Sequence, residues 1–398
     1  MDQEGLSMDL KTLDKTYVAP TYKRFSVAIV KGKGSVVFDA DGKEYIDLTS
    51  GIGVTSFGVA DDVWQAAVTE QIGLVQHMSN LYYTEPCARL AALLCEKTGM
   101  GKVFFSNSGA EANECAIKAA RKYAAEHRGA DCFTIATLNG SFHGRTLTTL
   151  AATGQAHYHE LFQPLTPGFL HIDPTTQALK KAAESHKLAA LMIECIQGEG
   201  GVIDLNVDFV REARAFTEAH DILLICDEVQ TGNGRTGELY VYMNYGITPD
   251  IVSTAKGLAG GLPLGATLLG EKVQNVLGFG DHGSTFGGNP VCCAAALSIL
   301  SRIDGELLEQ IKEKSDLLHE IFKGAKGIRS VSGRGFMLGL ETERSAGEIV
   351  NELIGRGVLC LTAKNKVRLL PALNIPTDIL LRAAEIIKEV CAAEPGST

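Results

Sequence analysis

Two charged side chains of opposite sign follow two apolar runs of the sequence. The run Ile222–Cys226 ends directly in Asp227, and the run Ile251–Thr254 is followed by Lys256 and then by glycines. A carboxylate at the exit of a buried strand is costly to desolvate unless a cation or a hydrogen-bond donor meets it. Each residue alone also has an ordinary explanation, a solvated turn for the acid and a surface lysine beside a flexible loop for the amine.

A third segment, Ser108-Gly109-Ala110, connects an apolar run to a helical stretch. Ser108 with Glu111 three residues later is the pattern of a capping box, in which the serine begins the helix. The same helix start also favours a phosphate, because its first backbone N–H groups and the helix dipole attract an anion. The two interpretations are compatible, since a capped helix can still bind a ligand.

Together the three segments match the needs of one cofactor, pyridoxal phosphate. Its pyridine nitrogen needs an anionic partner to stay protonated, its aldehyde needs an amine, and its phosphate needs an anion site. Asp227 and Lys256 are separated by about one strand–helix–strand step, so neighbouring strands can place them side by side. The combination is far more specific than any of its parts.

The surrounding sequence alternates short apolar runs with helical stretches. The expected strands are Val103–Phe105, Cys132–Thr137, Ala189–Ile193, Ile222–Cys226, Ile251–Thr254 and Ala266–Leu269, and the clearest helices are Glu111–Glu126 and Val207–His220. Near-continuous apolar strands with helices between them predict an α/β protein with a mostly parallel sheet covered on both faces. Ligands bind beyond the carboxyl ends of such strands, where Asp227 and Lys256 would lie.

The two ends of the chain predict a second, smaller unit. Its expected strands are the hairpin Val36–Leu48 and, near the C-terminus, Phe336–Leu340 and Val367–Leu370. The hairpin would turn at Asp41-Gly42, a dipeptide typical of tight turns. We therefore expect a large domain over residues 61–290 and a smaller α+β domain built from residues 1–60 and 291–398.

Composition narrows the class of protein. The 398 residues carry a formal net charge of −10, so the chain as a whole does not attract nucleic acid or an anionic membrane surface. No apolar run approaches the roughly 18 residues of a membrane span, and the acidic start lacks the features of a signal peptide. The ten cysteines form no Cys-x-x-Cys pair. We expect buried free thiols in a cytoplasmic protein.

Six segments, in the same order along the chain, resemble the class III aminotransferases. They are Asn107–Asn113, Ser141–Arg145, Glu194–Gly201, Asp227–Gly237, Ala255–Gly257 and Gly283–Pro290. The resemblance extends from about Val30 to Ala372. It implies the type I fold of pyridoxal-phosphate-dependent transferases and an enzyme that transfers amino groups.

The resemblance implies roles around the cofactor. Lys256 would bond to the aldehyde and, once substrate displaces it, would move the proton between two carbon atoms. Asp227 would pair with the pyridine nitrogen, and Gln230 would approach the phenolic oxygen of the ring. Val229 and Phe142 would lie against the two faces of the ring.

The phosphate would lie between two subunits. Ser108, Gly109 and Ala110 would hold it from one subunit, although the family usually has threonine at position 110, so one hydroxyl bond is lost. Thr285 would reach it from the second subunit, with Ser284 near the substrate. A site shared in this way implies an obligate homodimer.

The resemblance also implies the substrates. Arg145 would bind a substrate carboxylate through two parallel donors. Glu199 would neutralise Arg368 while the amino donor is bound and release it for the second carboxylate of 2-oxoglutarate. The implied donor is N-acetylornithine, in arginine biosynthesis, with succinylornithine, ornithine and 4-aminobutyrate as alternatives. Ile52 stands where ornithine-specific members tend to have tyrosine, and an apolar residue suits an acylated, uncharged α-amino group.

Two further segments depart from the family pattern. Cys195 stands where proline is common, which we interpret as a change in loop packing. Residues Gly58–Asp62 replace a Gly-His-x-His-Pro segment near the expected site entrance. Neither departure touches Lys256, Asp227 or Arg145.

The sequence disfavours three other functions. Gly232–Gly237 has Gly-x-Gly-x-x-Gly spacing, but no long amphipathic helix follows it, which disfavours a dinucleotide site. His143, His157 and His159 lack the spacing of metal ligands, so we expect solvated or hydrogen-bonded histidines and no metal. A non-catalytic dimer would be favoured only if Lys256 or Asp227 were absent.

Overall fold

The computed structural model describes residues 10–394. Its α-helices are α1 (Leu10–Tyr17), α2 (Ser50–Gly53), α3 (Asp62–Leu74), α4 (Glu85–Thr98), α5 (Gly109–Arg128), α6 (Leu147–Ala152), α7 (Thr176–Ser185), α8 (Val207–Ala219), α9 (Pro290–Leu300), α10 (Gly305–Phe322), α11 (Ala346–Gly355) and α12 (Thr377–Ala392). Short 3-10 helices are η1 (Ala156–Tyr158), η2 (Val241–Tyr245) and η3 (Lys256–Ala259).

The strands fall into a large and a small part of the molecule. They are β1 (Ile29–Lys33), β2 (Val36–Asp39), β3 (Glu44–Asp47), β4 (Lys102–Ser106), β5 (Thr134–Leu138), β6 (Phe169–Ile172), β7 (Leu188–Ile193), β8 (Ile196–Gln197), β9 (Ile203–Asp204), β10 (Leu223–Asp227), β11 (Ile251–Thr254), β12 (Gly265–Leu269), β13 (Ile328–Arg334), β14 (Met337–Thr342), β15 (Val358–Leu359), β16 (Leu361–Ala363) and β17 (Lys366–Leu369).

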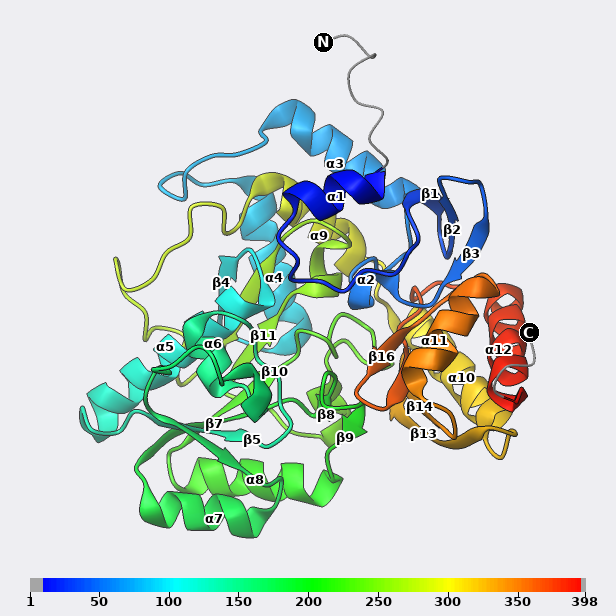
Figure 1. Cartoon of the computed structure of the whole chain (residues 1–398). Helices are drawn as coiled ribbons and strands as arrows, with labels where there is room; N and C mark the ends of the chain where they lie inside the picture. Colours follow the sequence, from blue (N-terminus) through cyan, green and yellow to red (C-terminus); the bar gives the residue numbers. More distant parts are fainter. Residues whose placement is uncertain (1–9, 395–398) are drawn as a thin grey trace.

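The large part is built on a seven-stranded sheet with the order β4-β12-β11-β10-β7-β5-β6 (Figure 1). β12 is antiparallel to both of its neighbours, whereas the pairs from β11 to β6 are parallel. The predicted mostly parallel sheet is thus confirmed. β6 was missed, because this short edge strand is only partly buried and lacks a continuous apolar run.

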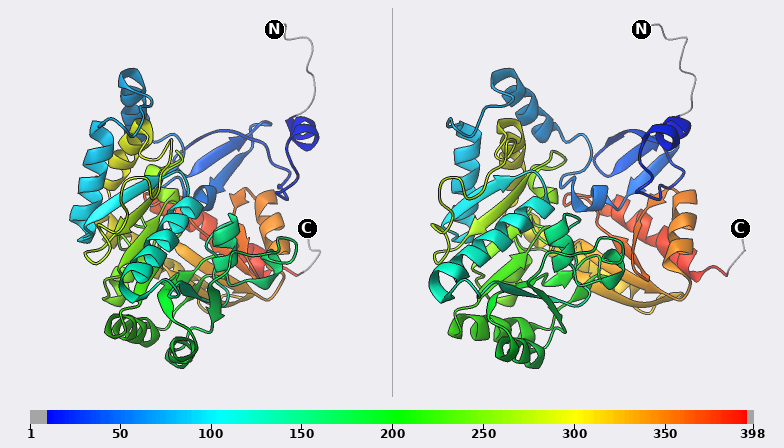
Figure 2. Two further views of the ribbon diagram at one scale, coloured as in Figure 1. Left: turned by 90° about the vertical axis from the view of Figure 1, so that its left-hand side faces the viewer. Right: turned by 60° about the vertical axis from the view of Figure 1, so that its left-hand side comes forward.

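Helices cover both faces of this sheet, as Figure 2 shows from two sides. In β10, Leu223 and Ile225 join the apolar cluster that includes α5, whereas Leu224 and Cys226 join the cluster on the opposite face, which includes Phe209 of α8. Successive side chains of a strand point to opposite faces, so a sheet buried on both sides needs apolar residues at every position. This requirement explains the unbroken apolar runs of the sequence.

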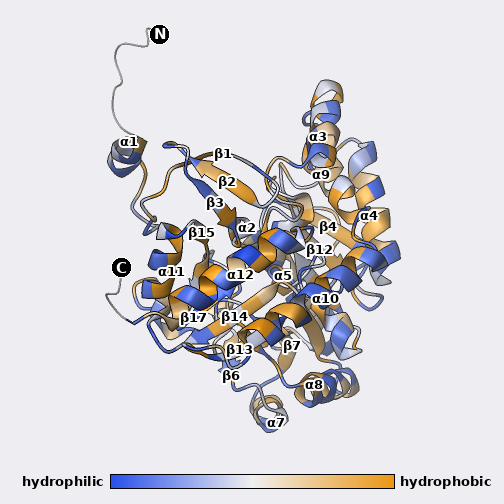
Figure 3. Cartoon of the chain, turned by 90° about the vertical axis from the view of Figure 1, so that its right-hand side faces the viewer, coloured by the Kyte–Doolittle hydropathy of each residue, from blue (hydrophilic) through white to orange (hydrophobic). Residues whose placement is uncertain are grey.

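The small part combines both ends of the chain. β15 pairs in parallel with β3, which joins the predicted N-terminal hairpin to the C-terminal region. The backbone N–H of Leu370 donates to the carbonyl of Leu48 at 2.7 Å. A second sheet, β13-β14-β17-β16, lies against α10 and α12. Both helices carry hydrophilic and hydrophobic residues (Figure 3), and the buried residues of α12 are all apolar, namely Leu380, Ala383, Ala384, Ile387, Val390 and Cys391. The α+β unit built from both termini agrees with the predicted fold class.

The predicted domain boundaries at residues 60 and 290 can be compared with the packing of the helices near them. The division at residues 60 and 290 stays a prediction. α9, which begins at Pro290, packs against α3 and α4 of the large part.

Among residues 10–394, no helix is both long and apolar enough to cross a membrane.

Candidate active site

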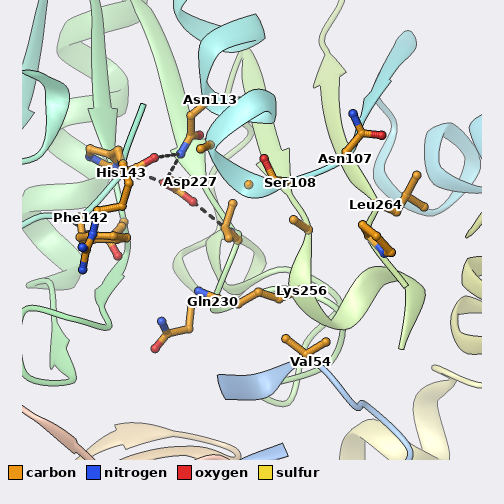
Figure 4. A pocket seen from close by; sticks show the side chains of 18 of the residues that line it. Val54, Asn107, Ser108, Asn113, Phe142, His143, Asp227, Gln230, Lys256 and Leu264 are labelled. Atoms are coloured by element: carbon orange, nitrogen blue, oxygen red, sulfur yellow. Dashed lines mark hydrogen bonds and ion pairs between the residues drawn. The ribbon is translucent and has the colours of Figure 1, made fainter. Parts of the chain in front are cut away.

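A cavity of about 580 Å³ opens where β4, β10 and β11 end (Figure 4). Its size is that of a small-molecule site. Ser108 follows β4, Asp227 ends β10, and Lys256 lies just after β11. The predicted site residues that line it are Ser108, Gly109, Ala110, Phe142, Arg145, Asp227, Val229, Gln230 and Lys256. The sheet therefore brings together segments that are far apart in the sequence.

Lys256 lies at the first position of η3 with a φ of +45°, a left-handed conformation that is rare for residues with a side chain. Such conformations persist where the surrounding structure enforces them. Burial lowers the pKa of the Lys256 amine, against the opposing charges of Glu199 and Asp227. The neutral amine is therefore favoured, and this form can attack a carbonyl carbon or accept a proton.

Asp227 is buried, with 5% of its surface exposed, and accepts three hydrogen bonds. Asn113 Nδ2 and His143 Nδ1 each lie 2.8 Å from its Oδ2, and the backbone N–H of Val229 lies 3.0 Å from its Oδ1. Because a carboxylate only accepts, Nδ1 of His143 carries the proton. These donors fix the carboxylate toward the cavity, as the dashed lines in Figure 4 show.

His143 supports the charge of Asp227. Burial disfavours the imidazolium, but the hydrogen bond and charge of Asp227, together with the charge of Glu194, outweigh burial and raise the pKa of His143. His143 is thus a buried, hydrogen-bonded histidine. Within residues 10–394, no group of three or more His, Cys, Asp and Glu side chains could hold a metal ion.

The start of α5 lies at the cavity wall. Ser108 Oγ accepts from the backbone N–H of Glu111 at 3.2 Å, so serine caps the helix, while the Glu111 carboxylate accepts from the N–H of Asn107 at 2.6 Å. A Cβ added at Gly109 would lie 2.5 Å from Cγ1 of Val229. The helix start can therefore approach the loop after β10 only with glycine at this position, which leaves its first N–H groups available for an anion.

Two aromatic side chains lie next to Arg145, the residue predicted to bind a substrate carboxylate. Phe142 lines the cavity, and its backbone N–H donates to Glu194 Oε2 at 2.8 Å. The guanidinium of Arg145 lies over the ring of Tyr158 at 4.7 Å and over that of Phe142 at 5.6 Å. None of the ion pairs within residues 10–394 involves Arg145. The stacking orients the guanidinium and does not use its N–H donors, and the binding of a substrate carboxylate by Arg145 stays a prediction.

Glu199 and Arg368 form an ion pair beside the cavity. Arg368 Nη1 donates to Glu199 Oε1 at 2.5 Å and to Gln230 Oε1 at 3.0 Å, and Gln230 Nε2 donates to the same glutamate oxygen at 3.2 Å. Burial would raise the pKa of Glu199, but the charge of Arg368 outweighs it and lowers this pKa. Gln230 connects the pair to the cavity, which it lines.

Ser284 and Thr285 do not line this cavity. They belong to a separate hollow of about 730 Å³ that also includes Asn80 and Phe104. Ser284 Oγ accepts from Asn107 Nδ2 at 3.0 Å, behind the cavity wall. Their assigned roles at the cofactor stay predictions.

Several lining residues had no predicted role at the cofactor or the substrate. They include Tyr22, Val54, Asn107, Asn113, His143, Glu194 and Leu264. Asn107, Asn113, His143 and Glu194 lie within the segments that resemble the family, which was the available signal. Tyr22 and Val54 come from the N-terminal segment, and no local pattern marks them.

The two segments that differ from the family pattern, at Cys195 and at residues 58–62, each form specific contacts in the structure. Cys195 is buried, and its carbonyl accepts from the hydroxyl of Tyr245 at 2.9 Å. Gly58 has a φ of +80°, and a Cβ there would lie 2.5 Å from the carbonyl oxygen of Gly34. Asp61 caps α3 by accepting from the N–H of Trp64 at 2.9 Å. A compact turn thus replaces the missing histidines.

Glu228, next to Asp227, predicts a pH dependence of stability. Burial raises the pKa of Glu228 to about 7, although Thr231 and two backbone N–H groups donate to its carboxylate. Its stabilising contribution is fully present below the ordinary value of 4.5 and is lost as the pH rises through 7. Relative to Glu228→Gln, the wild type should lose about 3 kcal/mol of unfolding free energy between pH 4.5 and 8.

Urea unfolding of both proteins across this pH range measures the difference. A difference in unfolding free energy that does not change with pH would contradict the prediction. Altered hydrogen bonding in the variant would only add a fixed offset to the pH-dependent part. Glu320→Gln, at an exposed position of α10, is the control.

The sequence model of the aminotransferase class-III family matches residues 17–391. The chain belongs to the class III aminotransferases. It is 46% identical over 387 residues to an acetylornithine aminotransferase of Haemophilus ducreyi, which covers 96% of this chain and 98% of that protein. A second relative of the same name, from Methanocaldococcus jannaschii, is 40% identical over 95% of this chain and 96% of its own length.

Solved structures agree with this assignment. An N-acetylornithine aminotransferase from Stenotrophomonas maltophilia has a TM-score of 0.83 at 34% identity, with coverage of 96% of this chain and 98% of that one. An ornithine aminotransferase from Toxoplasma gondii has a TM-score of 0.91 at 31% identity, with coverage of 95% and 93%. The predicted family and the type I fold are therefore confirmed.

Class III aminotransferases depend on pyridoxal phosphate, so this chain is a pyridoxal-phosphate-dependent enzyme. The cavity fits the group, because it presents an amine, a buried carboxylate and a helix start at three points of one wall. When bound, the cofactor supplies an aldehyde carbon and a ring that accepts electrons. Lys256 Nζ would take and return a proton at the substrate carbon, and Asp227 would hold a proton on the pyridine nitrogen.

Proposed function

We propose that the enzyme moves the δ-amino group of N-acetylornithine to 2-oxoglutarate, giving N-acetylglutamate 5-semialdehyde and glutamate in arginine biosynthesis. The observation that carries this proposal is the 46% identity over nearly the full chain to a relative of that name. The residues around the cavity are compatible with both substrates.

Arg145 is our proposed ligand for the substrate carboxylate, since its stacked guanidinium has no protein carboxylate partner among the described residues. Ile52, with 40% of its surface exposed, belongs to α2, and Val54, which follows α2, lines the cavity. Neither offers a carboxylate that would bind a free α-ammonium group. An acylated, uncharged amine suits these residues better.

For the acceptor, we infer that Glu199 and Arg368 act as a switch. With the donor bound, the ion pair neutralises the buried guanidinium. A second substrate carboxylate would compete with Glu199 for Arg368, because both are anions that can accept its donors. The position of Gln230 between this pair and the cavity supports the assignment.

We infer that the enzyme acts as a homodimer in the cytoplasm. Asn80 Nδ2 donates to the carbonyl oxygens of Ser284 and Gly287, at 3.0 and 2.9 Å, so two loops lie side by side. These loops expose large apolar side chains, namely Leu81, Tyr82, Tyr83, Phe279 and Phe286. Large apolar side chains exposed on neighbouring loops favour a protein partner. All ten cysteines are free, which suits a reducing compartment.

The amino-donor half-reaction tests the substrate. In the absence of any oxo acid, N-acetylornithine should abolish the visible absorption of the bound cofactor, whereas ornithine and 4-aminobutyrate should act at least about tenfold more slowly. Adding 2-oxoglutarate should then restore the band and yield one glutamate per donor consumed. If only another amine bleaches the band, the donor assignment is wrong while the family and the cofactor stand.

Ornithine is the second candidate donor, since the Toxoplasma gondii ornithine aminotransferase has the TM-score of 0.91. The same titration distinguishes the two. Succinylornithine, the third compound to test, differs from the proposed donor only in its acyl group.

A further inference from the structure

The loop formed by residues 231–237 has Gly-x-Gly-x-x-Gly spacing but is followed by the short 3-10 helix η2 rather than by an α-helix. A nucleotide phosphate would therefore lack its helix start. Thr231, Asn233, Arg235 and Thr236 of this loop are nonetheless buried. Buried polar side chains in native proteins are almost always hydrogen-bonded, so their partners reveal what the loop does.

Asn233 is bonded to the backbone that precedes Lys256. Its Nδ2 donates to Thr254 Oγ1 and to the carbonyl oxygen of Ala255, both at 3.1 Å. Asn233 itself has a φ of +58°, and Lys256 has one of +45°. The amide thus holds the chain at the point where it enters the strained conformation of the lysine.

Arg235 is bonded to the small part of the molecule. It is 2% exposed, and its Nη1 donates to the carbonyl oxygens of Phe336, at 3.4 Å, and of Pro371. The backbone N–H of Phe336 donates in return to the carbonyl of Arg235 at 2.8 Å. A buried guanidinium is costly unless its donors are satisfied, so these carbonyls are held where the arginine can reach them.

Arg368 lies in β17, and Pro371 lies three residues later, just beyond the end of this strand. The same segment is bonded to the N-terminal region, where the N–H of Leu373 donates to Ser56 O at 2.7 Å. Ser56 Oγ in turn donates to the carbonyl of Gly257, next to Lys256, at 2.8 Å. The loop therefore contacts both the backbone that precedes Lys256 and the segment that follows Arg368.

We propose that residues 231–237 are a positioning loop, in which Asn233 fixes the backbone before Lys256 and Arg235 fixes the segment that carries Arg368. The inference rests on the proposed role of Arg368 in binding the second carboxylate of the acceptor. Neither Asn233 nor Arg235 touches the reacting atoms. Misplacing a reacting group by about 1 Å can cost up to ~10²-fold in rate, so small displacements are measurable.

The two residues should give different kinetic signatures. Arg235→Lys keeps the charge but loses the guanidinium, whose Nη1 reaches both carbonyls in a fixed planar geometry. We expect the ratio of kcat/KM for 2-oxoglutarate to kcat/KM for pyruvate, which lacks the second carboxylate, to fall about tenfold or more. The rate of the donor half-reaction should change less than about threefold.

Asn233→Ala should act on both half-reactions. We expect both rates to fall by a similar factor of about ten, with the acceptor ratio unchanged. The pH midpoint of the cofactor absorption band should also shift, because the Lys256 amine is displaced. Arg235→Lys should leave this midpoint unchanged, which separates positioning from a general loss of structure.

Arg368→Ala is the reference variant, and circular dichroism with thermal unfolding checks the fold of each protein. If Arg368→Ala leaves the acceptor ratio unchanged, the proposed role of Arg368 is wrong. If Arg368→Ala lowers the ratio and Arg235→Lys does not, the positioning loop is wrong. If Arg235→Lys does not fold, Arg235→Met is measured in its place. Equal losses for both acceptors in the arginine variant would likewise overturn the inference.

Discussion

Lys256→Ala should lower the rate of transamination by at least about 10³-fold while the protein still folds and binds its cofactor. A positioned acid–base group contributes roughly 10²–10⁴-fold, and we propose that this amine also provides the covalent attachment. The carboxylate of Asp227 and the start of α5 remain in the variant, so the other groups that we propose to hold the cofactor stay in place. Steady-state kinetics and the absorption spectrum measure the two effects separately.

Lys272→Ala is the matched control for this variant. Lys272 forms a partly exposed ion pair with Asp221 at 3.0 Å, and its removal should leave the rate within about twofold. Added methylamine should partly restore the donor half-reaction of Lys256→Ala if the missing function is proton transfer. A variant that keeps more than a tenth of the wild-type rate would exclude Lys256 as the reactive amine.

Asp227→Asn should lower kcat by about 10²–10³-fold, the size expected when a preorganised charge at the reacting group is lost. Oδ2 of Asp227 accepts from both Asn113 and His143, so an amide NH₂ at that position would face two donors. In the other orientation the NH₂ would face the N–H of Val229. The variant therefore loses both the charge and the geometry.

The pKa of His143 gives a second readout. The hydrogen bond and charge of Asp227 raise this pKa against the effect of burial, so in Asp227→Asn burial prevails and the pKa should fall. NMR of labelled histidine measures the change. Since a raised histidine pKa stabilises the fold below its ordinary value of 6.5, the stability added on acidification should also shrink.

Asp250→Asn is the control for this second prediction. Asp250 is as buried as Asp227, at 6% against 5% exposed, but it precedes β11 and binds Arg214 at 2.7 Å. Its loss should destabilise the fold and leave kcat nearly unchanged. Equal losses of kcat in the two variants would mean that Asp227 acts through stability alone.

Much of the fold follows from local pattern. β10 and β11 agree with their predicted spans to within one residue, because strands buried on both faces are apolar at every position. α5 and α8 also lie close to their predicted spans; in the structure Ser108 caps the start of α5 and Asn206 caps the start of α8. β6 escaped prediction, since an edge strand needs no such run.

The sequence by itself determined the types of chemical group, their order at the strand ends and, through motif resemblance, the family. Each of these depends on residues that are near one another in the chain. The environment of those groups was decided only by the tertiary structure. Asn113 and His143, which are 114 and 84 residues from Asp227, meet one carboxylate oxygen, and Gln230 joins Arg368 across 138 residues. Hydrogen bonding and burial act through space, so no local pattern encodes these contacts.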